Sequence, residues 1–162
     1  MRSRATNTKK IDKKSLEQRT KKFAVDVIVF VNGLPKNKVG DVVGRQLLRS
    51  GTSVGANYRE ANRAQSYPDF IHKISIVEKE ASETQYWLDI LEDLELGDTF
   101  SRPALIGECA ELLAIFTSVG RTAKTRRADS TSLREDVEQY EADYTAQDTY
   151  SEGLFFEGDY SE

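Results

Sequence analysis

Apolar residues recur every three or four positions along most of the chain, and this spacing is typical of amphipathic α-helices. The pattern predicts four helices, over about residues 12–32, 38–64, 66–96 and 98–124. Turn-forming residues stand at the junctions: Gly33-Leu34-Pro35, Pro68, Gly97 and Pro103. Proline fixes its own backbone and disfavours helix at the residue before it. These residues therefore mark the same helix boundaries as the spacing of the apolar residues.

Short connections between helices of this length favour antiparallel neighbours. We therefore predict an all-α fold, an antiparallel up-down-up-down four-helix bundle over residues 12–128. Residues 1–11 are basic and lack periodicity, which indicates a flexible arm. Residues 129–162 are acidic and rich in tyrosine, and we expect a disordered tail with a helical turn or two near 132–144.

The net charge of −4 over 162 residues conceals a strong asymmetry. Residues 129–162 hold eleven acids and one base, a charge of −10, so residues 1–128 carry the remaining +6. A basic body favours contact with a polyanion.

Catalytic and metal-binding residue types are scarce in this sequence. Its one cysteine, Cys109, rules out a disulfide within the chain, and with its one histidine, His72, it nearly excludes a zinc site. A di-iron carboxylate bundle would need Glu-x-x-His on two helices. We expect no catalytic residues, no metal and no cofactor. The longest apolar run, 27–31, is too short to span a membrane, so we expect a cytoplasmic protein.

Four arginines of the second predicted helix lie within about 80° of one another, with small residues between them. They are Arg45, Arg49, Arg59 and Arg63. Arginine forks suit phosphates, but the same side chains could instead pair with Glu60, Glu78, Glu80 and Glu83 in a structural network. Both interpretations can hold for different arginines. Four further cations near the end of the last helix would extend the positive field: Arg121, Lys124, Arg126 and Arg127.

The third predicted helix carries a second flank beside its core stripe. This flank consists of Ile76, Glu80, Glu83, Trp87 and Ile90. A lone bundle needs one apolar stripe on each helix, so a second one indicates a contact between protomers. The alternative is a wide core that includes Trp87.

The acidic tail contains one apolar cluster, Leu154-Phe155-Phe156. Aromatic anchors among acids are typical of short docking segments. Two alternatives stay open: the tail only adds solubility, or it lies on the basic body and inhibits it.

Three segments resemble a known family: LRSGTSVGAN at 48–57, DFI at 69–71 and KEASETQYWL at 79–88. They are similar to the bacterial four-helix-bundle proteins encoded in intervening sequences of large-subunit ribosomal RNA genes. That family is similar in fold to the accessory variability determinant proteins of diversity-generating retroelements. The motif positions are Arg49, Ser50, Gly51, Gly55, Asn57, Glu60, Asp69, Phe70, Glu80, Glu83 and Trp87.

The resemblance implies a barrel-like homopentamer without enzymatic activity, and its retroelement relatives bind nucleic acid and a reverse transcriptase. Our leading hypothesis is a non-enzymatic homo-oligomer that binds RNA or DNA through basic surfaces, as an accessory to a reverse transcriptase or another nucleic-acid enzyme. The alternative is a protein-docking adaptor whose acidic tail recruits a partner or inhibits the basic surface.

Overall fold

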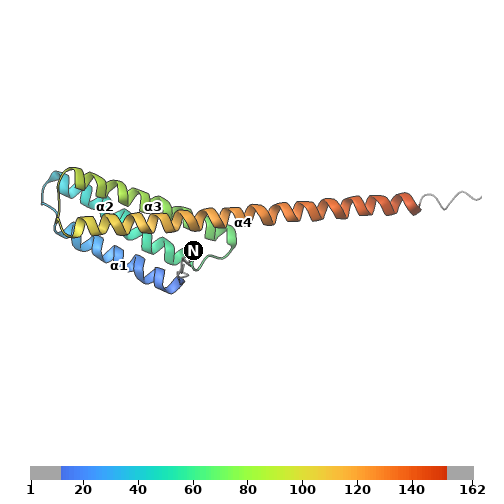
Figure 1. Ribbon diagram of the computed structural model, residues 1–162, viewed down its shortest axis with the longest axis horizontal. Coiled ribbons are helices and arrows are strands. Elements are labelled where there is room, and N and C mark those ends of the chain that lie inside the picture. Colours follow the sequence, from blue (N-terminus) through green and yellow to red (C-terminus); the bar gives the residue numbers. More distant parts are fainter. Residues whose placement is uncertain (1–11, 153–162) are drawn as a thin grey trace, which may run out of the picture. The chain divides into compact units, whose positions relative to one another are not determined.

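A computed structural model describes residues 12–152 of the chain. The basic arm at 1–11 and the Leu154-Phe155-Phe156 cluster lie outside the described residues. Four α-helices and no strand occur in the described range (Figure 1). The helices are α1 (Lys13–Asn32), α2 (Lys38–Ala61), α3 (Tyr67–Asp93) and α4 (Ser101–Glu152).

Local side-chain caps explain where three of the helices begin. Asn37 accepts the amides of residues 39 and 40 at the start of α2. Ser66 accepts the amide of Asp69 at 3.2 Å and confirms the predicted start of α3. Asp98 accepts both the amide and the hydroxyl of Ser101 at 2.7 Å, and these bonds lower the pKa of its carboxyl. Such caps satisfy amides that the first helical turn leaves without partners.

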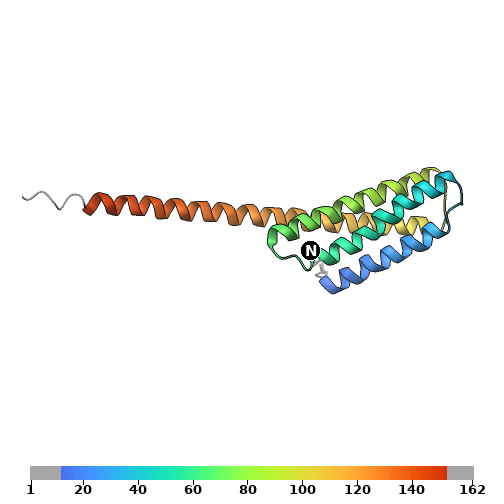
Figure 2. The ribbon, with the colours of Figure 1, turned by 180° about the vertical axis from the view of Figure 1, so that it is seen from behind.

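The helices pack as antiparallel neighbours, as Figures 1 and 2 show from opposite sides. α1 packs on α2 and α2 on α3. The first part of α4 joins α3 through Thr117, whose hydroxyl donates to Glu78 at 2.8 Å. It joins α1 through Arg19, which donates to Glu108 at 2.6 Å. The core is made of side chains buried from all four helices, including Phe23, Leu47, Leu88 and Phe116.

Three predicted helix ends are wrong. We expected the third helix to continue to residue 96, but α3 ends at Asp93. We expected the second helix to continue to residue 64, but α2 ends at Ala61. Ser66 must be extended to cap α3, so the chain has to leave the helix before it.

We also expected the last helix to end near Lys124, with a disordered tail from 129. Instead α4 continues to Glu152. No glycine or proline occurs between Gly120 and Gly153, so nothing in the sequence breaks the helix. An acidic, polar composition alone does not end a helix that lacks such residues. The chain divides into two units, Met1–Arg121 and Thr122–Glu162.

Candidate nucleic-acid interface

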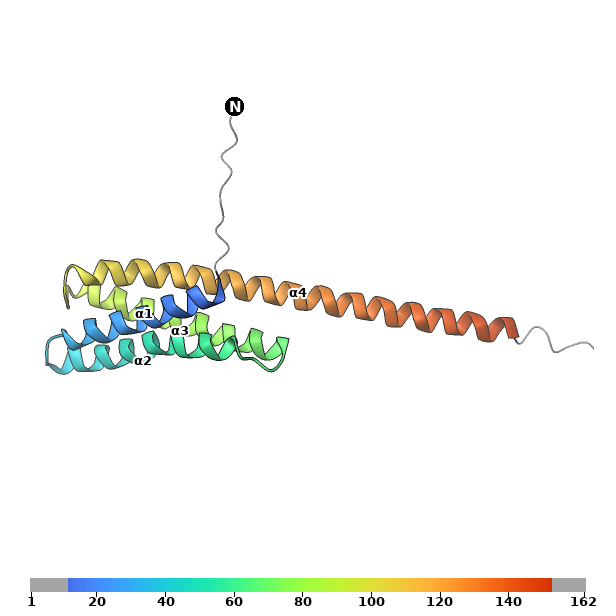
Figure 3. The same cartoon turned by 90° about the horizontal axis from the view of Figure 1, so that it is seen from below.

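A groove runs along the outer side of the α1–α2 seam. Its cations are Lys14 and Lys21 from α1 and Arg59 from α2, and its lining includes one carboxylate, Glu17. Figure 3 shows α1 and α2 lying side by side. All three cations are exposed, and within residues 12–152 none forms an ion pair. Glu17 accepts a hydrogen bond from the Asn62 amide at 2.9 Å. The groove therefore presents an excess of positive charge to solvent.

The floor of this groove consists of small residues, among them Ala24, Gly55 and Ala56. A Cβ added to Gly55 would lie 3.1 Å from the Thr20 carbonyl oxygen of α1. A Cβ at Gly51, one turn earlier, would lie 2.9 Å from Cγ1 of Val27. The glycines thus allow α1 and α2 to approach closely, while the long cationic side chains stand on both sides of a shallow floor.

The arginines predicted as one stripe have separate environments. Arg49 donates to Glu83 of α3 at 2.5 Å, so it belongs to a structural pair. Arg63 follows the end of α2 and donates to the Arg59 carbonyl at 3.3 Å. Arg45 and Arg59 are exposed and make no ion pair among the described residues. Of these four arginines, Arg59 lines the α1–α2 groove.

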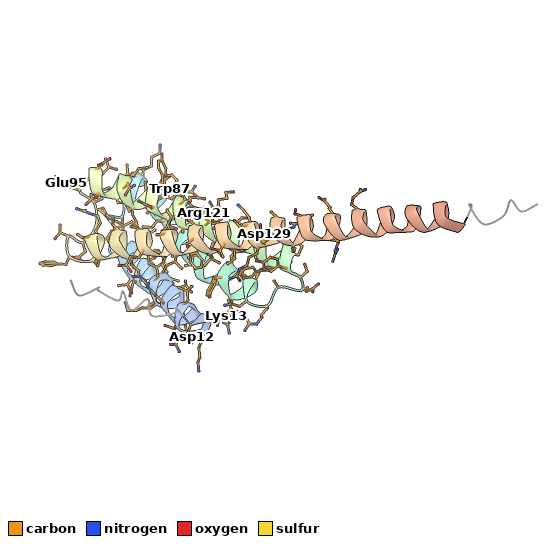
Figure 4. All side chains as sticks on the ribbon, turned by 45° about the vertical axis from the view of Figure 1, so that its right-hand side comes forward. Asp12, Lys13, Trp87, Glu95, Arg121 and Asp129 are labelled. Carbon is orange, nitrogen blue, oxygen red and sulfur yellow. The ribbon has the colours of Figure 1, made fainter. Side chains whose placement is uncertain are left out.

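The cations predicted near the end of the last helix are all exposed on α4. Arg121 is the last residue of the first unit, and Figure 4 labels it. Lys124, Arg126 and Arg127 belong to the second unit.

Part of the predicted second flank of α3 packs against the core of the bundle, at Trp87 and Ile90. Ile76, Glu83, Trp87 and Ile90 are partly buried, and Figure 4 labels Trp87. The Trp87 indole N–H donates to Glu83 at 3.4 Å, and the ring makes an edge contact with Tyr86 at 5.0 Å. Glu80 differs from our expectation of a surface residue, because only 9% of it is exposed.

Several features were missed from the sequence. We did not separate Lys14 and Lys21 from the other basic residues near the N-terminus, although their helical phase could have placed them beside the small residues of α2. We also missed an exposed apolar face on α1 formed by Val25, Ile28 and Val29. These positions lie away from the buried stripe of α1, a signal that was available in the spacing.

Metal ligands and the cysteine have the following environments in the described part of the chain. No cluster of three or more histidine, cysteine, aspartate or glutamate side chains in that range could hold a metal. Burial raises the pKa of the Cys109 thiol to about 12, so it is protonated at neutral pH and a poor nucleophile. By length and composition, one helix segment, Ser101–Ser132, could cross a membrane, but its Leu105, Leu112 and Phe116 form part of the bundle core.

Comparison with known proteins decides the family. The model of the 23S rRNA-intervening sequence protein family matches residues 13–118. The chain belongs to this family. A crystal structure of an S23 ribosomal protein family member of unknown function, from Bacteroides thetaiotaomicron VPI-5482, is similar in sequence and fold. It is 34% identical, with a TM-score of 0.62, and the match covers 68% of this chain and 99% of that one. No curated protein matches the chain.

The family match coincides with the first unit. It ends at residue 118, three positions before Arg121, and it includes both helices of the α1–α2 groove. The groove is therefore part of the family domain, whereas the acidic end of α4 lies beyond the match.

Proposed function

We propose that this family member is a non-enzymatic homo-oligomer that binds the phosphate backbone of RNA or DNA in the α1–α2 groove. The observation that carries the proposal is the presence of three exposed, unpaired cations beside a floor of small residues. Phosphate contacts by lysine and arginine release counterions and need no base-specific geometry. The binding is therefore expected to tolerate many sequences.

Oligomerisation would strengthen such binding, because several weak sites on one particle act together. Two surfaces support it: the exposed apolar face of α1 at Val25, Ile28 and Val29, and the Trp87 flank of α3. The resemblance implies five copies. Light scattering on the full chain gives this number directly.

The test is a salt titration of binding to a mixed-sequence single-stranded RNA and to duplex DNA. The groove variant replaces Lys14, Lys21 and Arg59 with alanine. The matched control replaces Lys36, Lys38 and Lys79, which are also exposed, form no ion pair in the described chain and lie outside the groove. Both variants lose three positive charges, so a change in net charge alone affects them equally.

Loss of three phosphate contacts should flatten the dependence of log affinity on log salt by about 2 units for RNA and about 3 for duplex DNA. The control variant should keep the wild-type slope within about 1 unit. Equal slopes for all three proteins, with intact oligomers, would remove the groove from the proposal. If wild type fails to bind at low salt, nucleic-acid binding itself is refuted.

Partner recruitment is the second candidate function, with a reverse transcriptase or another nucleic-acid enzyme as the partner. It is favoured by the end of α4, where residues 129–152 carry eight acids and one base on a continuous helix. Truncation after Arg127 separates the possibilities. Tighter RNA binding by the truncated chain indicates an inhibitory tail, and loss of the enzyme contact with unchanged RNA binding indicates docking.

A further inference from the structure

The lining of the α1–α2 groove includes a carboxylate, Glu17, among its cations. A carboxylate is unfavourable in a surface that only binds phosphates, because like charges repel. Its side chain is partly buried at the edge of the groove floor. A second role for this residue, toward some other part of the bound strand, would account for its position.

Glu17 forms no ion pair with the lysines beside it. Lys21 follows four residues later on α1, the spacing and order at which glutamate and lysine pair best on a helix. Nevertheless no salt bridge joins Glu17 to Lys21 or to Lys14 in the described chain. The side-chain amide of Asn62 donates to Oε1 of Glu17 at 2.9 Å instead. The carboxylate and the two lysines are therefore each available to a ligand.

The second oxygen of Glu17 is a free acceptor. Within residues 12–152, Oε2 accepts no hydrogen bond, and it is not among the buried atoms that lack a partner. The bond from Asn62 holds the other oxygen, so the carboxylate has a fixed anchor on one side and an open side toward solvent. A donor from outside the chain can reach Oε2.

Helical geometry places this carboxylate between two of the cations of the groove. Lys14, Glu17 and Lys21 fall within about 60° of one another around α1, and Glu17 lies about 4.5 Å along the axis from Lys14 and about 6 Å from Lys21. In a nucleic-acid strand, a sugar separates each phosphate from the next. When the two lysines contact phosphates of one strand, the carboxylate between them faces a sugar.

Ribose and deoxyribose offer different groups to a carboxylate in this position. The 2′-hydroxyl of ribose can donate a hydrogen bond, and bonds to a charged acceptor are among the stronger ones. Deoxyribose has no such donor. A DNA strand would therefore bring its phosphates beside a carboxylate that gains nothing in return, which lowers its affinity relative to RNA.

We propose that Glu17 makes the α1–α2 groove selective for RNA over DNA of the same sequence, by accepting a hydrogen bond from a ribose 2′-hydroxyl at Oε2. The inference rests on the proposed function, because it specifies the sugar of the strand that the groove binds. Asn62 acts as a positioning residue, which holds the carboxylate through Oε1.

The experiment measures the affinity of the full chain for one single-stranded sequence in three forms. These are RNA, DNA with uracil in place of thymine, and 2′-fluoro RNA, which keeps the sugar conformation of RNA but has no 2′-hydroxyl to donate. We expect wild type to bind the RNA about tenfold more tightly than either of the other strands. The 2′-fluoro comparison uses wild type alone, so it answers the question even if a variant fails to fold.

Two variants test the residue itself. Glu17→Gln keeps an acceptor for Asn62 and replaces the free oxygen with an amide group, and Glu17→Ala removes both oxygens. Each should reduce the preference for RNA to within about twofold. The matched control is Glu92→Gln, because Glu92 is exposed on α3, forms no ion pair in the described chain and lies outside the groove. Glu17→Gln and Glu92→Gln each remove one negative charge, so charge alone changes RNA and DNA affinity together, and only the Glu17 variants should change their ratio.

Equal affinity of wild type for RNA and DNA would overturn the inference and leave the proposed function in place. The inference is also wrong if the RNA preference survives in both Glu17 variants, or if wild type binds the 2′-fluoro strand as tightly as RNA. A wild type that binds none of the three strands refutes the proposed function, and the inference then fails with it.

Discussion

The two seams that α2 shares with its neighbours use cations in opposite ways. On the α1 side, Lys14, Lys21 and Arg59 face one carboxylate and make no ion pair in the described chain. On the α3 side, Arg49 pairs with Glu83, and Lys73 pairs with Glu60. Both seams contain lysine and arginine side chains. The difference lies in pairing: α2 and α3 each supply one cation and one carboxylate to these ion pairs, whereas α1 places two further lysines and only Glu17 beside Arg59.

This difference separates a structural cation from one that is available to a ligand. A paired arginine must give up its carboxylate before it can bind phosphate, whereas an unpaired one has only water to lose. The α1–α2 groove is therefore the better candidate for phosphate contact, although Arg49 and Arg59 belong to the same helix. The comparison can be tested from both sides.

Charge reversal should show the largest contrast between the seams. We expect Lys21→Glu with Arg59→Glu to lower RNA affinity at low salt by about 100-fold, or about 2.7 kcal/mol, because it removes two attractive charges and adds two repulsive ones. Arg49→Glu should change the affinity by less than about fivefold. Fluorescence anisotropy with labelled RNA measures both. A larger loss of RNA affinity for Arg49→Glu would mean that the α2–α3 seam, and not the α1–α2 groove, contacts phosphate.

A substitution that disturbs the close approach of α1 and α2 should have the next largest effect, on the free energy of unfolding. Gly51→Ala places a methyl group against the fully buried, stiff Val27 side chain, so we expect a net loss of about 1–2 kcal/mol in unfolding free energy. The matched control is Gly107→Ala, because nothing lies within 4 Å of that position and alanine favours helix by about 1 kcal/mol. Urea unfolding measures both. Equal stabilisation by the two substitutions would mean that the helices are not in close contact at Gly51.

Removal of the Arg49–Glu83 ion pair should have the smallest effect, a small loss of unfolding free energy. Its side chains are 58% and 24% exposed, so solvent screening limits the coupling to about 0.2–1 kcal/mol. A double-mutant cycle of Arg49→Ala and Glu83→Gln, followed by urea unfolding, measures this coupling. RNA affinity should stay unchanged in all three variants. A coupling free energy of zero would mean that Glu83 does not hold Arg49, so that Arg49 would be as available to phosphate as Arg59.

Much of the fold could be predicted from the spacing of apolar residues and from the positions of glycine and proline. A period of 3.6 residues assigns one face of α3 to the core before any contact is known, and Ile74, Val77, Ala81, Leu88 and Leu91 are buried. The length of α4 could also have been predicted, since no glycine or proline follows Gly120 before Gly153.

The candidate nucleic-acid interface was harder to predict, because it depends on which helices face each other and in what register. Arg49 and Arg59 look equivalent in sequence, and only the register of α3 brings Glu83 to the first of them. The burial of Glu80 likewise depends on how α3 packs against its neighbours. Spacing within one helix contains no information about either contact.

Lysine acetylation of the full chain, with and without saturating single-stranded RNA, tests the central claim most directly. Mass spectrometry reads every lysine in one experiment. The account predicts that Lys14 and Lys21 become protected, while Lys36, Lys38 and Lys79 react at the same rate in both samples. Protection of the last three, with Lys14 and Lys21 still reactive in the RNA complex, would contradict it.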